Sequence, residues 1–447
     1  MSRSLACCIA ACAWAGSAWA VTVAHLDNGA TLVAARGTGC EQYGCAVLVR
    51  ADARDDGEKP GLRALLGGAT LACVDGMSGD SVLARLSELE ELGGRVSTHV
   101  DDSYIMLAAS GLSDSFDLAC AVLSDAVSRP AYPDGSIEAG RRRAADEARR
   151  QTGDLFYSSL ADIRHALFAA APVWPAAGTA EGLAAVTGED LSAAHDALFV
   201  GTRMVVACVG PWDERTILDR IRPIATAAPR GEPPPAPIGP SPSPYTRSRV
   251  YESRGTRLSV LMIGFPMPGT NSPDWPTARM LQAVLGGQDG RLGRNARLRQ
   301  YSQTGDAVLV PGPGDSQLVI VCATPLSWHI ESVREEIMRS LEELGSGPVQ
   351  PHELEMARRK LLGQQAFGLR DPLGRALALG VPLLTPDARE PSADPLEPFR
   401  QVTPDAVREL AAQRLQPESA AMALVLPMLG RPEGFSSFPE LGAALWR

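Results

Sequence analysis

Histidine is the side chain that most often binds metals and moves protons near neutral pH, and this chain of 447 residues has only six of them. The two that lie closest in sequence, His329 and His352, are 23 positions apart. No two histidines share a helical turn, which excludes a local zinc motif such as H-E-x-x-H. The six are His25, His99, His165, His195, His329 and His352.

Lysine is rarer still, because only Lys59 and Lys360 are present among 42 basic residues. Neither follows a glycine-rich turn, so the chain has no phosphate-binding loop of the P-loop type. Both lie in charged segments, which are poor places for a catalytic amine. The net charge of -10 argues against a nucleic-acid backbone as the main partner, and we expect no nucleic-acid binding.

Residues 1–20 have the composition of an export signal. Arg3 precedes a short apolar run, and Ala18 and Ala20 form a cleavage site of the A-x-A type. We therefore expect cleavage near Ala20 and a periplasmic or secreted mature protein. A competing hypothesis places a lipid anchor on Cys12, although the segment before it is very short. No later run is apolar over 18 residues, so we expect no transmembrane span.

Export would permit disulfides, and six cysteines remain once residues 1–20 are removed. Cys40 and Cys45 flank a short turn between two strand-like runs, so a disulfide across this hairpin is one hypothesis and free thiols are the other. The remaining four lie in apolar stretches that are typical of buried free thiols, at Cys73, Cys120, Cys208 and Cys322.

A proline-rich stretch at 229–245 divides the mature chain into two parts of similar length. Its composition predicts a semi-rigid linker without helix or strand. The sequence therefore predicts a first lobe at 21–228 and a second lobe at 246–447.

The two lobes also resemble each other. Thr187 and Thr403 each resemble the N-cap of a helix that leads into an apolar strand, at 204–209 and 421–426 respectively. The offset of 216 residues between the two threonines indicates an internal duplication.

Apolar periodicity elsewhere groups strands with flanking helices, without strict alternation of the two. We therefore predict an α+β fold with two homologous lobes, each a mainly antiparallel sheet packed with helices. The other predicted strands are 22–25, 31–35, 46–50, 96–109, 258–265, 306–310 and 317–323. The other predicted helices are 61–73, 81–92, 116–127, 137–151, 275–285, 329–344 and 351–367.

Short motifs follow one another along these elements: L-D-N-G at 26–29, G-L at 61–62, L-G-G at 92–94, L-G-G at 285–287 and L-R at 298–299. In their order and spacing the sequence resembles the pitrilysin/insulinase-type metallopeptidases. The resemblance is to the short two-lobed form, which includes the mitochondrial processing peptidase and the bc1 core proteins. It covers essentially the whole mature chain, and no single motif carries it.

Active members of that family bind zinc through an H-x-x-E-H motif after the Gly-Leu start, with a distal Glu on a later helix. The resemblance places Ala64 and Gly68 at the two histidine positions and Gly67 at the general-base position. Glu147 falls at the distal ligand position, where a solvated or salt-bridged acid is the alternative. One carboxylate cannot hold zinc alone, so we expect no metal and no other cofactor in this chain.

The resemblance also implies a surface that binds an extended peptide. One strand that lines the cleft in the family falls at 97–99, and a second-lobe arginine that grips the substrate backbone falls at Arg299, where a structural ion pair is the alternative. The tyrosine expected with that arginine falls near Val308, and Tyr301 is out of register. The candidate substrate-binding residues are Ser97, Thr98, His99 and Arg299.

These features favour a non-catalytic subunit. It would pair with a homologous active metallopeptidase subunit that holds the zinc, and the two would enclose a peptide substrate and pair with its backbone. One alternative is an active zinc metalloendopeptidase with relocated ligands such as His99, Asp101 and Glu147. Another is a structural subunit like the core proteins of a membrane complex.

Overall fold

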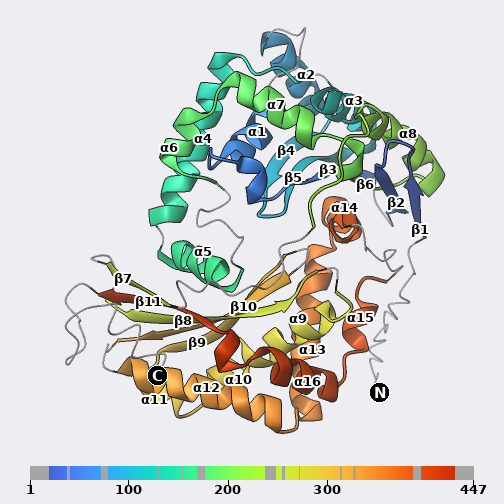
Figure 1. Cartoon of the computed structure of the whole chain (residues 1–447). Coiled ribbons are helices and arrows are strands. Elements are labelled where there is room, and N and C mark those ends of the chain that lie inside the picture. Colours follow the sequence, from blue (N-terminus) through green and yellow to red (C-terminus); the bar gives the residue numbers. More distant parts are fainter. Residues whose placement is uncertain are drawn as a thin grey trace, which may run out of the picture.

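The structure is a computed structural model of the chain. It describes residues 20–37, 41–71, 79–128, 130–153, 155–168, 177–236, 248–253, 257–270, 272–312, 315–325, 329–385 and 394–427. The predicted export signal before Ala20, Cys40 and the second half of the predicted linker lie outside these residues. Two sheets, each covered by helices, form an upper and a lower lobe in Figure 1.

The first sheet has six strands in the order β1-β2-β6-β3-β5-β4. All neighbours run antiparallel except β2 and β6, which are parallel. The central strands β3 and β6 are buried along nearly their whole length, whereas the edge strand β4 alternates between exposed and half-buried residues. The strands are β1 (Val21–His25), β2 (Thr31–Arg36), β3 (Gln42–Arg50), β4 (Arg95–Val100), β5 (Tyr104–Leu112) and β6 (Met204–Gly210).

Helices cover one face of the first sheet and bury a continuous apolar core against it. Thr187 caps its helix as predicted, because its side chain accepts a hydrogen bond from the backbone N–H of Asp190. The helices of this lobe are α1 (Leu62–Thr70), α2 (Gly79–Glu91), α3 (Phe116–Ser128), α4 (Asp134–Gly153), α6 (Ala180–Ala185), α7 (Gly188–Leu198) and α8 (Glu214–Thr226).

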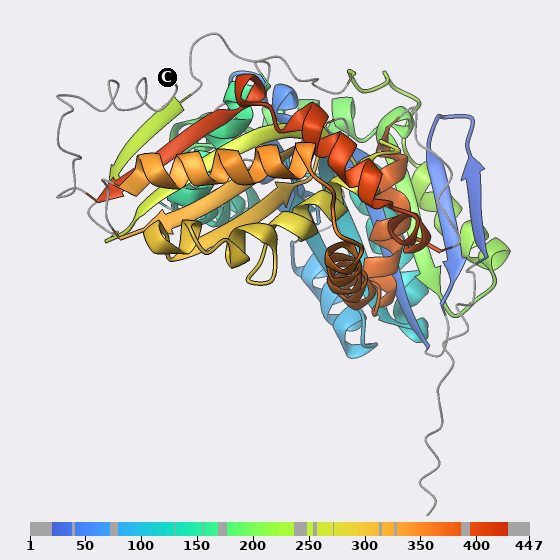
Figure 2. The same ribbon diagram turned by 90° about the horizontal axis from the view of Figure 1, so that it is seen from below.

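The second sheet has five strands in the order β7-β11-β8-β10-β9. They are β7 (Ser248–Ser253), β8 (Ser259–Pro268), β9 (Thr304–Val310), β10 (Asp315–Thr324) and β11 (Ala421–Pro427). Figure 2 shows α12 and α16 side by side over one face of this sheet. The helices of this lobe are α9 (Trp275–Leu285), α10 (Arg291–Arg294), α11 (Leu298–Tyr301), α12 (Ile330–Ser346), α13 (Pro351–Gly368), α15 (Glu397–Arg400) and α16 (Pro404–Arg414).

Apart from β1, which has no counterpart among the described strands of the second sheet, the two sheets share one topology, as the predicted duplication requires. Strand β6 runs parallel to β2 and antiparallel to β3, and β11 runs parallel to β7 and antiparallel to β8. Thr403 caps α16 as Thr187 caps α7. The strands β6 and β11, each preceded by a capped helix, therefore occupy the same place in the two sheets.

Each sheet carries on its other face a helix from the opposite half of the chain (Figure 1). Helix α14 (Pro372–Gly380) packs on β3 and β6, and α5 (Leu155–Leu167) packs on β8 and β11. Glycines make room for both helices. A Cβ at Gly44 would lie 2.2 Å from the backbone N of Leu373, and one at Gly264 would lie 2.1 Å from Ile163 Cγ2. The two lobes are thus held together by α5 and α14, each of which packs on the sheet of the other lobe.

The described part of the predicted linker, 229–236, has neither helix nor strand and lies against the first lobe. The backbone N–H of Gly201 donates to the carbonyl of Pro229 at 2.7 Å, and Arg50 Nη2 donates to the carbonyl of Pro235 at 2.9 Å. This half of the linker therefore forms part of the surface of the first lobe.

Strand β3 begins at Gln42, four residues before the predicted start, and this bears on the two hypotheses for Cys45. Cys45 lies inside the ladder opposite Cys208 and is a fully buried free thiol. Of the two hypotheses for this hairpin, the structure favours the free thiol at Cys45, which is buried in the core, and Cys40 lies outside the described residues.

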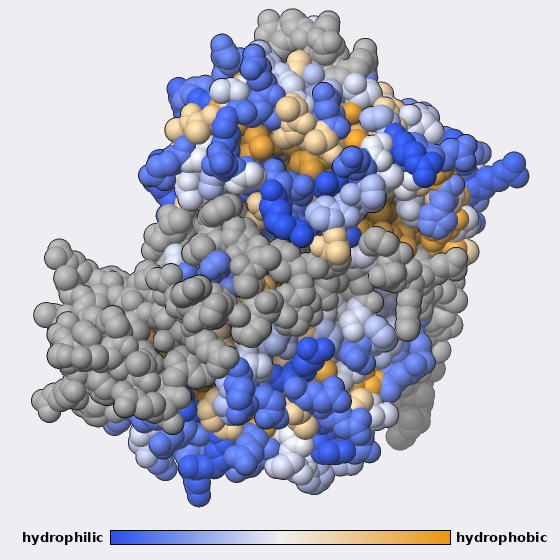
Figure 3. All heavy atoms as spheres, in the orientation of Figure 1, coloured by the Kyte–Doolittle hydropathy of each residue, from blue (hydrophilic) through white to orange (hydrophobic). Residues whose placement is uncertain are grey.

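On the face seen in Figure 3, hydrophilic side chains dominate both lobes, and apolar ones gather in the middle of the upper lobe. None of the helices described in the structure combines the length and the apolar character that crossing a membrane requires.

Candidate peptide-binding edge and altered metal site

A buried ion pair fixes the start of α1, the helix that carries the predicted catalytic positions. Arg63 Nε lies 3.2 Å from Asp56 Oδ1, and neither side chain is exposed. Arg63 Nη1 also donates to the carbonyls of Ala51 and Asp101, at 3.2 and 3.1 Å. Burial raises the pKa of Asp56, and the Arg63 guanidinium opposes that shift. Arg63 thereby ties α1 to the end of the edge strand β4.

The three predicted catalytic positions lie on α1 and offer no metal ligand. Ala64 and Gly68 are half-buried and lie one helical turn apart, as the two histidines of the family motif would. Gly67 is buried, and a Cβ there would lie 2.5 Å from Val100 Cγ2 on β4. A methyl group and two hydrogen atoms supply neither zinc ligand nor base, so these residues do not fit the zinc that the fold family implies.

The alternative ligand set is only partly assembled. His99 Nε2 lies 3.9 Å from Asp101 Oδ2, and the nearby Asp101 carboxylate raises the pKa of His99. Glu147 belongs to α4, and its side chain lies outside the described part of the structure. No three His, Cys, Asp or Glu side chains among the described residues are placed to hold a metal ion.

The predicted substrate-binding residues of the first lobe lie on β4, at the edge of the sheet. Ser97, Thr98 and His99 pair with Ala108, Leu107 and Met106 of β5, and among the described strands β4 has no second neighbour. Ser97 and His99 are exposed on one face, whereas Thr98 is half-buried on the other. The outer backbone groups of β4 can therefore pair with an added strand.

This edge lies close to the junction between the lobes. In the turn between β4 and β5, Asp102 Oδ2 lies 3.7 Å from Arg164 Nη1 on α5. Helix α5 in turn packs on the second sheet. A peptide added to β4 would thus lie beside α1 and near the second lobe.

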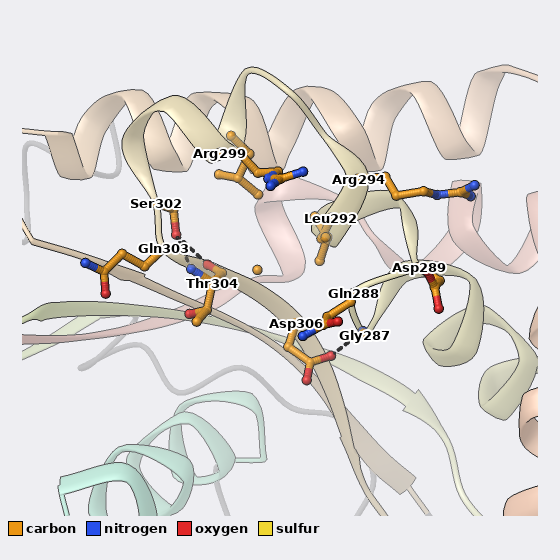
Figure 4. Close-up of a pocket in the computed structure, with 13 residues that line it drawn as sticks. Gly287, Gln288, Asp289, Leu292, Arg294, Arg299, Ser302, Gln303, Thr304 and Asp306 are labelled. Atoms are coloured by element: carbon orange, nitrogen blue, oxygen red, sulfur yellow. Dashed lines mark hydrogen bonds between the residues drawn. The ribbon is translucent and has the colours of Figure 1, made fainter.

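The second lobe has a polar pocket of about 670 Å³ where α10, α11 and the start of β9 meet (Figure 4). Arg294 and Arg299 extend from the helical turns, and Gly287 and Asp306 lie on the opposite side. Asp306 Oδ1 accepts the backbone N–H of Gly287 at 2.7 Å, which holds the glycine-rich turn against β9. Gly287 has a φ of 82°, a conformation that favours glycine.

Arg299 is exposed, and its side chain makes no hydrogen bond or ion pair with a described residue. The structural ion pair considered from the sequence is therefore not formed within the described chain. Tyr301 packs its ring against His329 with centroids 5.3 Å apart, so it belongs to the core of the second lobe. Val308 lies within β9 and adds no polar group.

The structure divides the predicted substrate-binding residues between two surfaces. Ser97, Thr98 and His99 line the first-lobe edge, whereas second-lobe residues alone line the pocket of Arg299. Two further pocket residues, Arg294 and Asp306, were not among the predicted ones. Their signal in the sequence is their position on either side of the predicted L-R motif, because Arg294 ends the helical turn before it and Asp306 lies in the strand after it.

Comparisons with known proteins agree with this geometry. Residues 185–361 match a family model described as "Peptidase M16 inactive domain". The mitochondrial-processing peptidase subunit beta of Saccharomyces cerevisiae is 20% identical over 354 residues, which are 75% of this chain and 76% of that protein.

Solved structures show the same fold. A peptidase M16 inactive domain from Pseudomonas fluorescens has a TM-score of 0.79 at 18% identity, covering 92% of this chain and all of that one. A protease from Helicobacter pylori also has a TM-score of 0.79, at 14% identity, covering 91% and 99%. A chain of complex III2 from Candida albicans has a TM-score of 0.73 at 13% identity, covering 95% and 99%.

Residues 185–361 thus match the peptidase M16 family, and the fold of the described chain is that of M16-like proteins. The matched family model does not reach α1, where Ala64, Gly67 and Gly68 stand at the positions that the resemblance assigns to the catalytic motif.

Proposed function

We propose that this chain is the non-catalytic subunit of a peptidase complex, in which a homologous active subunit holds the zinc and cuts the peptide. The observation that carries the proposal is the state of α1. The helix is intact beside a free strand edge, yet Ala64, Gly67 and Gly68 provide no catalytic group.

The proposed binding of a peptide is supported by the edge strand β4 and by the pocket of Arg299. An extended peptide adds to a free edge through backbone hydrogen bonds, which demand little of its sequence. Arg299 supplies guanidinium donors that can bond to peptide carbonyls. We propose that β4 and Arg299 hold a peptide from the two lobes, and that this chain binds no zinc of its own.

The proposed pairing of this chain with a second subunit is supported by its relatives. The yeast relative is a subunit by name, and the Candida albicans structure is a multi-subunit complex. We propose a homologous H-x-x-E-H subunit as the partner, in the periplasm or outside the cell after cleavage near Ala20.

The test is to produce the mature chain alone and together with an H-x-x-E-H homologue encoded beside it. We expect peptide cleavage to rise strongly when both chains are present, and to vanish when the first motif histidine of the partner is replaced by alanine. When this chain carries Ser97→Pro, most of the increase in peptide cleavage should be lost, because proline removes a backbone N–H and distorts the edge strand. Equal cleavage with and without this chain would refute the proposal.

A second candidate function is a structural subunit, and the fold shared with the complex III chain favours it. This candidate predicts that the chain co-purifies with a membrane complex whether or not peptide is present. The non-catalytic peptidase subunit predicts instead that it co-purifies with the H-x-x-E-H homologue.

A further inference from the structure

Two cysteines face each other across the centre of the first sheet. Cys45 of β3 and Cys208 of β6 are direct partners in the antiparallel ladder, between the pairs Gly44–Val209 and Ala46–Ala207. Both are fully buried in the core beneath α3 and α8, and both are free thiols. The two side chains are in hydrogen-bonding contact, which raises the pKa of Cys45 well above its usual range, and burial raises it further.

The ladder places these residues within the range that a disulfide requires. Directly opposite residues of an antiparallel pair have Cα atoms about 4.5 to 5.5 Å apart, and disulfides span about 4.4 to 6.8 Å. Opposite residues also point to the same face of the sheet. A bond between Cys45 and Cys208 therefore needs little backbone movement.

We propose that Cys45 and Cys208 are joined by a disulfide in the mature protein. The step is an exchange in which both thiols lose their protons and two electrons pass to the disulfide of a thiol–disulfide oxidoreductase, which leaves as a dithiol. The proposal rests on the predicted export, because such oxidants act in oxidising compartments. It does not rest on the proposed function, since a disulfide here would stabilise the first lobe with or without a partner.

The burial of both thiols determines at which stage of folding the disulfide can form. In the folded lobe Cys45 is covered and its thiolate is scarce, so exchange there is slow. The bond therefore forms while β3 and β6 are still open to the oxidant, before α8 covers them. It then links the third strand of the lobe to its last.

The other buried thiols serve as internal controls. Cys322 of β10 is fully buried as well, but its ladder partners are Gly305 of β9 and Leu261 of β8. Cys120 of α3 packs in the same core as Cys45 but lies on a helix and has no ladder partner. We expect both to stay reduced.

The experiment uses the full chain purified from the compartment to which it is delivered. The protein is unfolded in urea with iodoacetamide and without reductant, and its peptides are identified by mass spectrometry. We expect a disulfide-linked peptide pair that joins Cys45 to Cys208, with Cys120 and Cys322 alkylated. Alkylation of both Cys45 and Cys208, or a link from Cys45 to Cys40, would overturn the proposal.

A stability measurement gives an independent readout. A reductant should raise the unfolding equilibrium constant of the wild-type chain by roughly 10²-fold, because the bond closes a long loop. The variant Cys45→Ala/Cys208→Ala should be insensitive to reductant, and Cys322→Ala should respond as the wild type does. An equal response of the wild type and the double variant would contradict the proposal.

Discussion

The two lobes share one sheet topology, yet the surroundings of their edge strands differ. Strand β4 lies beside a helix whose catalytic positions are Ala64, Gly67 and Gly68, whereas β9 lies beside a polar pocket with two unpaired arginines among the described residues, Arg294 and Arg299. The comparison teaches that α1 offers no metal ligand, while each lobe presents an edge strand with one described neighbour. The helix survives because the Arg63–Asp56 ion pair and apolar packing hold it, not a metal.

The largest effect should come from the glycines that admit the exchanged helices. Gly44→Val should cost at least about 3 kcal/mol, because its side chain meets the backbone of Leu373, which cannot move aside. Gly264→Val should cost less, roughly 1–3 kcal/mol, because it meets the Ile163 side chain. Urea unfolding measures both, with Gly363→Ala on the open side of α13 as control. An equal loss in the free energy of unfolding for the two variants would show that the two sheets tolerate a side chain at these positions equally poorly.

Acid should weaken the first lobe more than the second. Burial lowers the pKa of His195 to about 4, whereas the duplicated position in α16 is Ala411. The unfolded chain binds a proton near pH 6.5 and the folded chain does not, so stability falls as pH drops from 6.5 to 4, by about 3 kcal/mol. His195→Phe should flatten this slope, and the exposed His25→Gln should leave it unchanged. An unchanged slope in His195→Phe would contradict the assignment.

A smaller contrast separates neighbouring positions of α1. Gly67→Ala should destabilise the chain by roughly 1–2 kcal/mol, because its methyl group meets Val100. Gly68→Ala should stabilise it by up to about 1 kcal/mol, since that position is open and alanine favours a helix. Opposite signs in chemical unfolding support the orientation of α1, and equal signs would refute it.

The last contrast concerns the second-lobe pocket and is measured as peptide binding. Arg299→Ala should weaken the binding of a peptide to the paired complex by roughly tenfold, which is typical of one lost charged hydrogen bond. Arg297→Ala is the matched control, because Arg297 is exposed in the same segment but does not line this pocket. Fluorescence anisotropy of a labelled peptide measures both, and equal losses would show a general charge effect.

Much of the fold could be predicted because most elements bury a periodic apolar face within their own lobe. The helix over 275–285 and the cap at Thr187 were predicted as the structure has them. Helices α5 and α14 were not predicted, since each buries its apolar face on the sheet of the other lobe, and local periodicity does not reveal a partner so distant in sequence. The packing of one lobe on the other was therefore not predicted from the sequence.

The candidate site was predictable in part for a similar reason. Motif order placed Ala64, Gly67 and Gly68 on a helix and 97–99 on a strand, and the structure has both. Sequence spacing did not show that β4 is an edge strand or that Arg63 is fully buried, because strand order and burial depend on long-range packing. The start of β3 was placed four residues too late, so sequence spacing did not show that Cys45 lies in the ladder opposite Cys208.

The measurement that tests the central claim most directly is the zinc content and peptide cleavage of the mature chain alone. The account predicts well under one zinc per chain after incubation with the metal, and no cleavage of an extended peptide. One zinc per chain together with cleavage that a chelator abolishes would contradict it, because it would require catalytic ligands outside Ala64, Gly67 and Gly68.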